Sequence, residues 1–380
     1  VIRDCVRLKN EWAVKSPPWE EKLKPDIRDW KKIDSAWLEG VLATNGIEAR
    51  IADFTAKPVG TGQIGDCARF QIEYASAPET APTSLVGKFP SESDESRNTG
   101  RLLSNYFREV KFYQTLQSGA KISTPKMYYS DLNEETHDFV MMMEDLAPAE
   151  QGDQLIGSTL DQTYLVLSEA AKLHSAYWND ESLDQYWWIQ ETSNAPEVLP
   201  PEIFDDTWKA FKARYGDRVT DRAKTIGDAL SVNMEAYGES RVGTKCLIHT
   251  DFRPDNMLFA TAAGGRPLTV VDWQSFAFGP PASDVGYFIA GALKPELRKE
   301  NEDELLEFYS DELRRNGAGA YSKEELNRHY VMGAYQHFMT AYFAAVMVTQ
   351  TPRGDDMFFK MLNGGVDLIF DHGAEEWFRS

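Results

Sequence analysis

Residues 246–274 of the chain read CLIHTDFRPDNMLFATAAGGRPLTVVDWQ, and this stretch carries the most specific pattern in the sequence. A short apolar run, Cys246–Ile248, leads into an H-x-D-x-x-x-x-N string. Two further apolar runs, Met257–Phe259 and Leu268–Val271, are separated by a turn that contains a Gly-Gly pair and a proline. Asp272 follows the second of them directly. Short apolar runs on either side of such a turn predict an antiparallel hairpin.

The hairpin is expected to bring two oxygen-bearing side chains together at its open end. The two strands are similar in length, so Asn256 and Asp272 flank that end, where directly opposed residues lie about 4.5–5.5 Å apart. An amide oxygen and a carboxylate at this separation can share one magnesium ion, which keeps water and phosphate oxygens as its other ligands. Asp251, on the intervening loop, is expected to orient an attacking hydroxyl and accept its proton. His249 is expected to pack behind this loop and hold its shape.

Each of these residues also has a plainer explanation. An isolated H-x-D is common, Asn256 fits a turn, and Asp272 fits a cap of the next segment. The ordered combination of strand, H-x-D-x-x-x-x-N string, hairpin and aspartate is much more specific than its parts. It favours the chemistry of phosphoryl transfer.

Upstream of this stretch, the hydrophobic pattern predicts a small sheet. An N-terminal extension rich in Trp, Pro and Lys precedes a helix at Ile33–Asn45, with Asp34 or Ser35 as its N-cap. Strands are then predicted at Ala68–Tyr74, Ser84–Phe89, Lys126–Ser130 and Phe139–Glu144, with a helix at Arg97–Gln117. Residues 1–144 are therefore expected to form an N-terminal nucleotide-binding lobe with a small antiparallel sheet.

After Asp145 the pattern becomes mainly helical. Helices are predicted at Asp161–Trp178, Pro201–Tyr215, Asp221–Ala236, Glu302–Asn316, Lys323–Gln350 and Asp355–Phe370. Residues 145–380 are thus expected to form a helical C-terminal lobe with the catalytic loop and the substrate site, joined to the first lobe by a hinge near Glu144–Pro148. The predicted fold class is α+β with two lobes.

The first lobe contains two charged residues at positions that the pattern predicts to be buried. Glu109 lies in the apolar stripe of the predicted helix, together with Leu102, Tyr106, Tyr113 and Leu116. Lys88 lies in an apolar strand. Burying either charge alone is unfavourable, so we expect them to pair, which would orient the lysine toward nucleotide phosphates. The alternative is that Lys88 extends to solvent and Glu109 lies at the edge of the stripe.

Two weaker features point to nucleotide binding in the same lobe. Gly60 and Gly62 precede a predicted strand, and glycines allow backbone N–H groups to close over phosphate oxygens. They fit an ordinary hairpin turn equally well, and the G-K-[ST] ending of a Walker loop is missing. At the hinge, Met143, Glu144 and Leu146 are expected to contact adenine, although methionines also suit packing between lobes.

Composition narrows the class of partner. A net charge of −20 argues against a nucleic acid. Residues 145–380 hold 38 acidic against 21 basic residues, which suits either a cationic substrate or simple solubility. Cys5, Cys67 and Cys246 show neither metal-ligand nor disulfide spacing, and we identify no signal peptide and no apolar run long enough to span a bilayer. We expect a cytoplasmic protein with no membrane and no obligatory protein partner.

Together these motifs resemble the aminoglycoside phosphotransferase and choline-kinase-like superfamily, and they look closest to its ecdysteroid-kinase-like and acyl-CoA-dehydrogenase-associated branches. They run in the family's order from about residue 50 to residue 290. The matching stretches are LVGK (85–88), FREVKFY (107–113), MMEDL (142–146), AKLH (171–174), HTDFRPDN (249–256), VDW (271–273) and GPPASDVGY (279–287). The helical residues beyond them carry no motif that matches.

The resemblance implies a protein-kinase-like fold and a role for each matching residue. Asp251 would be the catalytic base, and Asn256 and Asp272 would hold magnesium. Lys88 would bind the ATP phosphates with Glu109 behind it, and the hinge would take adenine.

The resemblance also implies structural roles and exposes two departures. His174 and Asp284 would be structural, with Asp284 capping a helix and bracing the catalytic loop. Thr250 stands where many members have glycine. Trp273 replaces the Phe of the protein-kinase D-F-G motif, and no activation segment with an A-P-E ending follows it. A small acceptor is therefore favoured over a peptide.

The sequence predicts transfer of the γ-phosphoryl group of Mg-ATP to a hydroxyl of a small molecule. One rival is a nucleotide-binding regulatory pseudokinase, which would have lost a ligand; another is a metal-dependent hydrolase, which would need a second acidic cluster with histidines. The acceptor stays open, as does the choice between ATP and GTP. The acidic second lobe suits an amine-bearing alcohol, whereas a flat alcohol would suit the aromatic residues Trp187, Trp188, Tyr335, Phe338, Tyr342 and Phe343.

Overall fold

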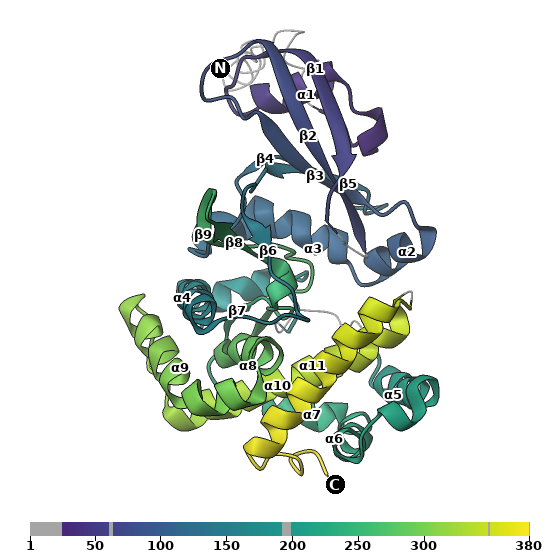
Figure 1. The fold of residues 1–380 in the computed structure, drawn as a ribbon, viewed down its shortest axis with the longest axis vertical. Coiled ribbons are helices and arrows are strands. Elements are labelled where there is room, and N and C mark those ends of the chain that lie inside the picture. Colours follow the sequence, from purple (N-terminus) through teal and green to yellow (C-terminus); the bar gives the residue numbers. More distant parts are fainter. Residues whose placement is uncertain (1–24, 61–63, 192–198, 349, 380) are drawn as a thin grey trace, which may run out of the picture.

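The chain folds into a sheet lobe and a helical lobe (Figure 1). A computed structural model describes residues 25–60, 64–191, 199–348 and 350–379. The sheet lobe has five strands, and every pair of neighbours is antiparallel. In spatial order the strands are β1 (Arg50–Pro58), β2 (Gly65–Ser76), β3 (Ser84–Pro90), β5 (Phe139–Glu144) and β4 (Met127–Leu132).

The hydrophobic pattern did not predict β1, because buried and exposed residues do not alternate along this strand. Its side chains are all exposed or half-buried. It is held by pairing with β2, in a register that sets Phe54 opposite Ile72. Helix α1 (Ser35–Ala43) packs against β1 and lies within the predicted Ile33–Asn45. It begins after Asp34, whose carboxylate accepts the N–H of Trp37 at 2.8 Å as an N-cap.

Strand β5 joins two hydrophobic cores because it is buried on both faces. Val140 and Met142 pack into the core beside α1. Phe139, Met141 and Met143 face the larger core, which continues into the helical lobe. The methionine-rich sequence of this strand is therefore explained by two-sided packing, for which flexible methionine side chains are well suited.

The single helix predicted after β3 is two α-helices followed by a π-helical segment, Phe112–Leu116. α2 (Asp94–Leu102) and α3 (Asn105–Lys111) are separated at Ser104, whose φ of 55° is left-handed and interrupts the helix. Leu102 is consequently 72% exposed and does not belong to the buried stripe, which corrects the prediction. Glu109 and the remaining residues of the stripe are buried.

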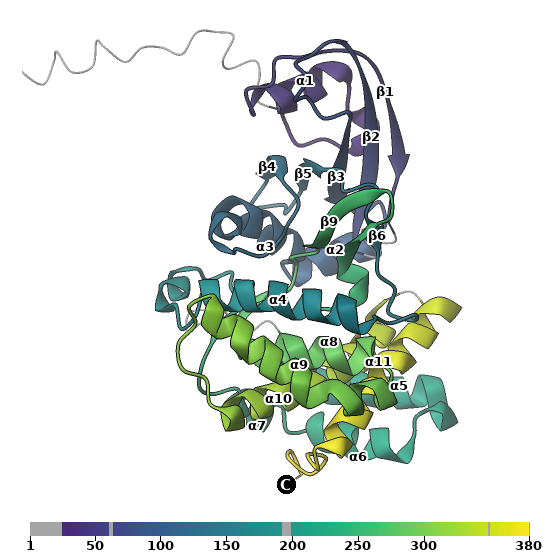
Figure 2. The ribbon, with the colours of Figure 1, turned by 60° about the vertical axis from the view of Figure 1, so that its left-hand side comes forward.

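The second lobe is built mainly from helices (Figures 1 and 2). Their bounds are α4 Leu160–Ala176, α5 Glu202–Tyr215, α6 Asp221–Leu230, α7 Met234–Ser240, α8 Pro281–Ala292, α9 Pro295–Arg315, α10 Lys323–Met347 and α11 Pro352–Asp371. The helix predicted over Asp221–Ala236 is in fact α6 and α7. Helix α8 was not predicted, because every one of its residues is buried and no polar face marks a helical period.

Helices α8 and α10 approach each other closely at two glycines. A methyl group added at Gly286 of α8 would overlap the carbonyl oxygen of Tyr330. One added at Gly333 of α10 would overlap the carbonyl oxygen of Ser283 and lie 2.7 Å from the backbone nitrogen of Tyr287. The backbones of the two helices are therefore in direct contact.

The predicted hairpin lies between the sheet and the helices (Figure 2). Its strands are β8 (Met257–Thr261) and β9 (Gly264–Val270), with β6 (Glu150–Gln151) at the edge of β8. Met257 lies opposite Val270, and the N–H of Val271 donates to the carbonyl oxygen of Asn256 at 3.0 Å. The pairing therefore continues to the open end, where Asn256 and Asp272 were expected.

Candidate active site

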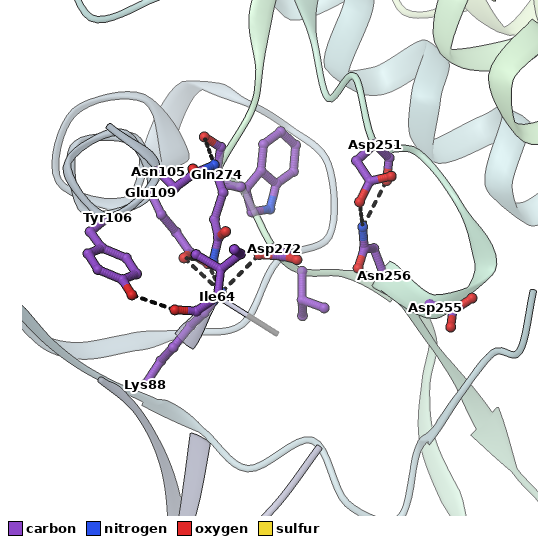
Figure 3. A network of polar contacts seen from close by, with 12 residues as sticks. Ile64, Lys88, Asn105, Tyr106, Glu109, Asp251, Asp255, Asn256, Asp272 and Gln274 are labelled. Carbon is purple, nitrogen blue, oxygen red and sulfur yellow. Dashed lines mark hydrogen bonds and ion pairs between the residues drawn. The ribbon is translucent and has the colours of Figure 1, made fainter. Parts of the chain in front are cut away.

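Five of the predicted site residues lie together where β3, α3 and the hairpin meet (Figure 3). Lys88 Nζ lies 2.7 Å from Glu109 Oε2 and 2.9 Å from Asp272 Oδ1. The other two, Asp251 and Asn256, are joined by a hydrogen bond on the loop 249–256, which we call the catalytic loop after its predicted role. The predicted Lys88–Glu109 ion pair is therefore present, and the same ammonium also bonds to the aspartate that follows β9.

Burial and the neighbouring charges have opposite effects on the pKa values of Lys88 and Glu109. Burial alone would lower the pKa of Lys88, but the carboxylates of Asp272 and Glu109 raise it above its ordinary value, so the lysine is charged. Burial raises the pKa of Glu109, and the charge of Lys88 opposes that change. The amide of Gln274 donates a further hydrogen bond to Glu109 Oε2 at 3.1 Å. Because burying a charge is unfavourable, these ionic and hydrogen-bond partners are required to stabilise the buried groups.

Asp251 is held by three neighbouring side chains. The hydroxyl of Tyr287 donates to Oδ1 at 2.8 Å, and the amide of Asn256 donates to Oδ2 at 2.8 Å. Arg253 Nε lies 3.1 Å from Oδ1. Burial alone would raise the pKa of Asp251, but the charge of Arg253 and these hydrogen bonds lower it below its ordinary value. The carboxylate is therefore ionised and fixed in direction.

Asn256 and Asp272 offer oxygen atoms to a hard cation. The amide nitrogen of Asn256 is committed to Asp251, which leaves its oxygen on the side of Asp272 in Figure 3. One carboxylate oxygen of Asp272 bonds to Lys88, and the side chain is 35% exposed. Two such oxygens fit magnesium, which takes few protein ligands. Within the described ranges, no three or more His, Cys, Asp and Glu side chains are grouped to hold a metal.

The catalytic loop is braced from behind by Asp284 in the first turn of α8. Its carboxylate accepts the N–H of His249 at 2.7 Å and the N–H of Thr250 at 2.9 Å. His174 lies 3.2 Å from the same carboxylate. The bracing role expected for Asp284 is thus present, but the N-cap residue of α8 is Pro280 rather than Asp284.

His249 occupies the position expected for it behind the loop. It is fully buried, and its Nε2 lies 3.0 Å from the carbonyl oxygen of Val271. Its ring lies 4.7 Å from the ring of Trp273, which stacks on Phe112 at 3.9 Å. The loop begins after β7 (Cys246–Ile248), which pairs with β10 (Ala277–Gly279) and not with the hairpin.

The residues predicted to contact adenine lie at the end of β5 and in the connection that follows it. Met143 is buried in the larger core. The backbone N–H of Glu144 donates to the carbonyl oxygen of Lys126, and the carboxylate of Glu144 forms an ion pair with Arg266 at 2.7 Å. Leu146 follows in the connection between the lobes, with its carbonyl oxygen accepting the N–H of Ala149.

Only one of the two predicted glycines can be placed. Gly60 has a φ of 80°, so its backbone adopts a conformation that favours glycine. Gly62 lies outside the described residues.

Sequence reasoning missed four polar contacts and misjudged the aromatic residues. Tyr287, Arg253, Gln274 and Gln336 all bond to site residues or to the catalytic loop, and Gln336 alone lies outside the motifs that were identified. Arg253, Gln274 and Tyr287 each lie within three residues of Asp251, Asp272 or Asp284, and this proximity was a signal that could have found them. Gln336 has no such signal, because it lies 86 residues from Thr250, to which it bonds. Of the aromatic residues proposed for a flat acceptor, Trp188, Tyr335, Phe338 and Tyr342 are core residues, whereas Trp187 is half-exposed and Phe343 partly buried.

The small sheet lobe carries a lysine–glutamate pair. This pair faces two aspartates and an asparagine on the hairpin side of the helical lobe. Together these features define the class of two-lobed kinase-like phosphotransferases. The family model described as "Ecdysteroid kinase-like family" matches residues 60–318. The chain belongs to this family.

Solved structures share the two-lobed, protein-kinase-like fold. One is a putative aminoglycoside phosphotransferase from Ralstonia eutropha, 14% identical, with a TM-score of 0.52 over 90% of this chain and 98% of that one. Another is a microcompartment-associated aminopropanol kinase, 13% identical, with a TM-score of 0.51 over 85% of this chain and 94% of that one. At these identities the likeness concerns the fold alone.

A curated relative extends beyond the chain. An uncharacterized oxidoreductase of Caenorhabditis elegans is 20% identical over 302 residues, which are 73% of this chain and 35% of the relative. The chain thus spans about a third of the length of that relative. Across the described ranges, no helix is both long and apolar enough to cross a membrane.

Proposed function

We propose that the chain transfers the γ-phosphoryl group of Mg-ATP to a hydroxyl of a small molecule. The observation that carries this proposal is the junction of the two lobes, where Lys88 bonds to Glu109 and Asp272 while Asp251 and Asn256 bond to each other nearby. Membership of the ecdysteroid kinase-like family supports it. When bound, the metal-nucleotide supplies the phosphoryl group and neutralises its charge.

Each residue has a role in this proposal. Lys88 binds phosphate oxygens, oriented by Glu109. Asn256 and Asp272 hold the magnesium through side-chain oxygens. Asp251, already ionised, accepts a hydrogen bond from the acceptor hydroxyl and takes its proton.

The hinge and the glycine segment complete the nucleotide site in this proposal. Met143, Glu144 and Leu146 contact adenine, and Gly60, with Gly62, offers backbone N–H groups to phosphate oxygens. Neither assignment affects the chemistry of transfer at Asp251.

The proposed acceptor is a neutral or an amine-bearing alcohol. The matched family is described as ecdysteroid kinase-like, and two fold relatives as a putative aminoglycoside phosphotransferase and an aminopropanol kinase. These names cover neutral and amine-bearing alcohols. The test is ATP consumption over a library of both kinds of alcohol, with mass spectrometry for a phosphorylated product. Parallel reactions with GTP identify the donor. Magnesium-dependent thermal stabilisation by ATP without any product would instead indicate the regulatory pseudokinase.

A further inference from the structure

Thr250, which directly precedes Asp251, has an unusual backbone conformation. Its φ is 69°, in the left-handed region that β-branched residues rarely adopt because the side chain crowds the backbone. Asp272 also has a positive φ, of 67°. Both carboxylates of the proposed mechanism are therefore placed by left-handed residues, one by its neighbour and one by its own backbone.

Every polar group of Thr250 has a partner that holds this conformation. Its N–H donates to Asp284 Oδ1 at 2.9 Å. Its carbonyl oxygen accepts the amide of Gln336, from α10, at 2.9 Å. Its hydroxyl donates to the carbonyl oxygen of Ser275 at 2.7 Å and lies 2.9 Å from the hydroxyl of the same serine. The first two contacts are made by the backbone and the third by the side chain, so only the third is lost when a residue with an N–H group but no hydroxyl replaces Thr250.

The contact with Ser275 joins the two halves of the site. Ser275 lies three residues after Asp272, in the segment that leads from β9 to β10. Thr250 lies next to Asp251 in the catalytic loop. The hydroxyl therefore links the segment that carries one carboxylate to the segment that carries the other. Glycine would adopt the same backbone conformation without strain, but it could not form this link.

We propose that Thr250 is a positioning residue whose hydroxyl, through Ser275, fixes the separation of Asp251 and Asp272. This inference rests on the proposed function, because the separation matters only if both carboxylates serve one reaction. The strained backbone at Thr250 is retained because the side chain provides the link. Small displacements of reacting groups lower turnover steeply, so the link is expected to affect kcat more than binding of the nucleotide.

Three substitutions at Thr250 separate the hydroxyl from the backbone strain. Thr250→Val keeps the branched shape and removes the donor, and kcat for Mg-ATP hydrolysis, with water as the acceptor, should fall about 10- to 100-fold with KM for ATP unchanged. Thr250→Gly should lose as much kcat while its Tm stays equal to or above that of the wild type. Thr250→Ser keeps the hydroxyl and should restore kcat to within about threefold of the wild type.

A matched control relieves the same kind of strain elsewhere. Lys121 is exposed and has a φ of 54°, so Lys121→Gly should raise Tm without changing kcat. The inference is overturned if Thr250→Val keeps the turnover of the wild type, if Thr250→Ser loses as much as Thr250→Val, or if Lys121→Gly lowers kcat as far as Thr250→Gly does.

A measurement that needs no activity keeps this inference separate from the proposed function. Hydrogen exchange should become faster in residues 249–256 and 272–276 of Thr250→Val, and stay unchanged in β3. If exchange is unchanged in both segments, the link does not exist. A wild-type protein that neither binds nor hydrolyses Mg-ATP contradicts the proposed function, whereas the exchange result still tests the link.

Discussion

The two clusters of the candidate site are held in different ways. The Lys88 cluster joins side chains from three elements far apart in the sequence, and its contacts are ionic: Lys88 bonds to Glu109 and to Asp272. In the Asp251 cluster, Asp251, Arg253 and Asn256 lie on one short loop, whereas Tyr287 and the brace Asp284 come from α8.

The Lys88 cluster can therefore rearrange when a ligand binds, whereas the Asp251 cluster is already fixed. We call them the rearrangeable half and the preset half of the site. The ammonium of Lys88 is shared between two carboxylates, so an incoming phosphate can replace one of them while Glu109 remains. Asp251 is bonded through both oxygens and its loop through the backbone, so its direction is set before anything binds. We expect substitutions in the first cluster to change binding and stability, and substitutions of Asp251 and of its brace Asp284 to change turnover.

The largest effect is expected at Asp251. Asp251→Asn removes the proposed proton acceptor and should lower kcat about 10²- to 10⁴-fold, because general base catalysis contributes about that much. The affinity for Mg-ATP, measured by calorimetry, should stay close to that of the wild type. Asp161→Asn, at the exposed start of α4, is the matched control and should change neither quantity. Turnover within a few-fold of the wild type in Asp251→Asn would contradict the mechanism.

Breaking the buried pair should give the next effect, on stability. Lys88→Met leaves Glu109 buried without its cation, and the free energy of unfolding should fall by about 3–5 kcal/mol. The double variant Lys88→Met/Glu109→Met removes both charges and should recover much of that loss, because packed apolar side chains can replace a buried ion pair. Urea unfolding of the three proteins measures this. A double variant less stable than the single one would show that the pair itself provides the stability.

A smaller effect is expected from removing the brace of the preset half. Asp284→Ala leaves the N–H groups of His249 and Thr250 without their acceptor, which should lower the free energy of unfolding by about 1–3 kcal/mol. Turnover should fall while the Kd for Mg-ATP does not, as measured by calorimetry beside steady-state kinetics. A weaker Kd with unchanged kcat would reverse the assignment of the two clusters.

The smallest effect is expected at the hinge, where an ion pair is exposed. Arg266 and Glu144 lie 2.7 Å apart with 40% and 32% of their side chains exposed, so water and salt screen their attraction. Arg266→Ala should lower the free energy of unfolding by less than about 1 kcal/mol. Urea unfolding measures this as well. If Arg266→Ala lost as much free energy of unfolding as Lys88→Met, solvent exposure would not explain the difference expected between the two ion pairs.

Local patterns in the sequence predicted most of the fold and the polar centre of the site. The hairpin, the Lys88–Glu109 pair and the loop of Asp251 follow from alternation, from charges in apolar stripes and from a spaced motif. β1 and α8 could not be found this way, because β1 has no fully buried residue and α8 has no exposed one. The contacts of Gln336 and Ser275 with Thr250 depend on how distant segments pack, which no local period encodes.

The contact of α8 with α10 has a consequence for surveys of sequence variants. Asp284, which braces the catalytic loop, and Tyr287, which bonds to Asp251, flank Gly286 on α8. A side chain at Gly286 or Gly333 would force the two helices apart and carry both of those residues away from the loop. In a saturation mutagenesis screen, these two glycines should tolerate substitution as poorly as the residues that contact the reactants, although neither offers a functional group of its own.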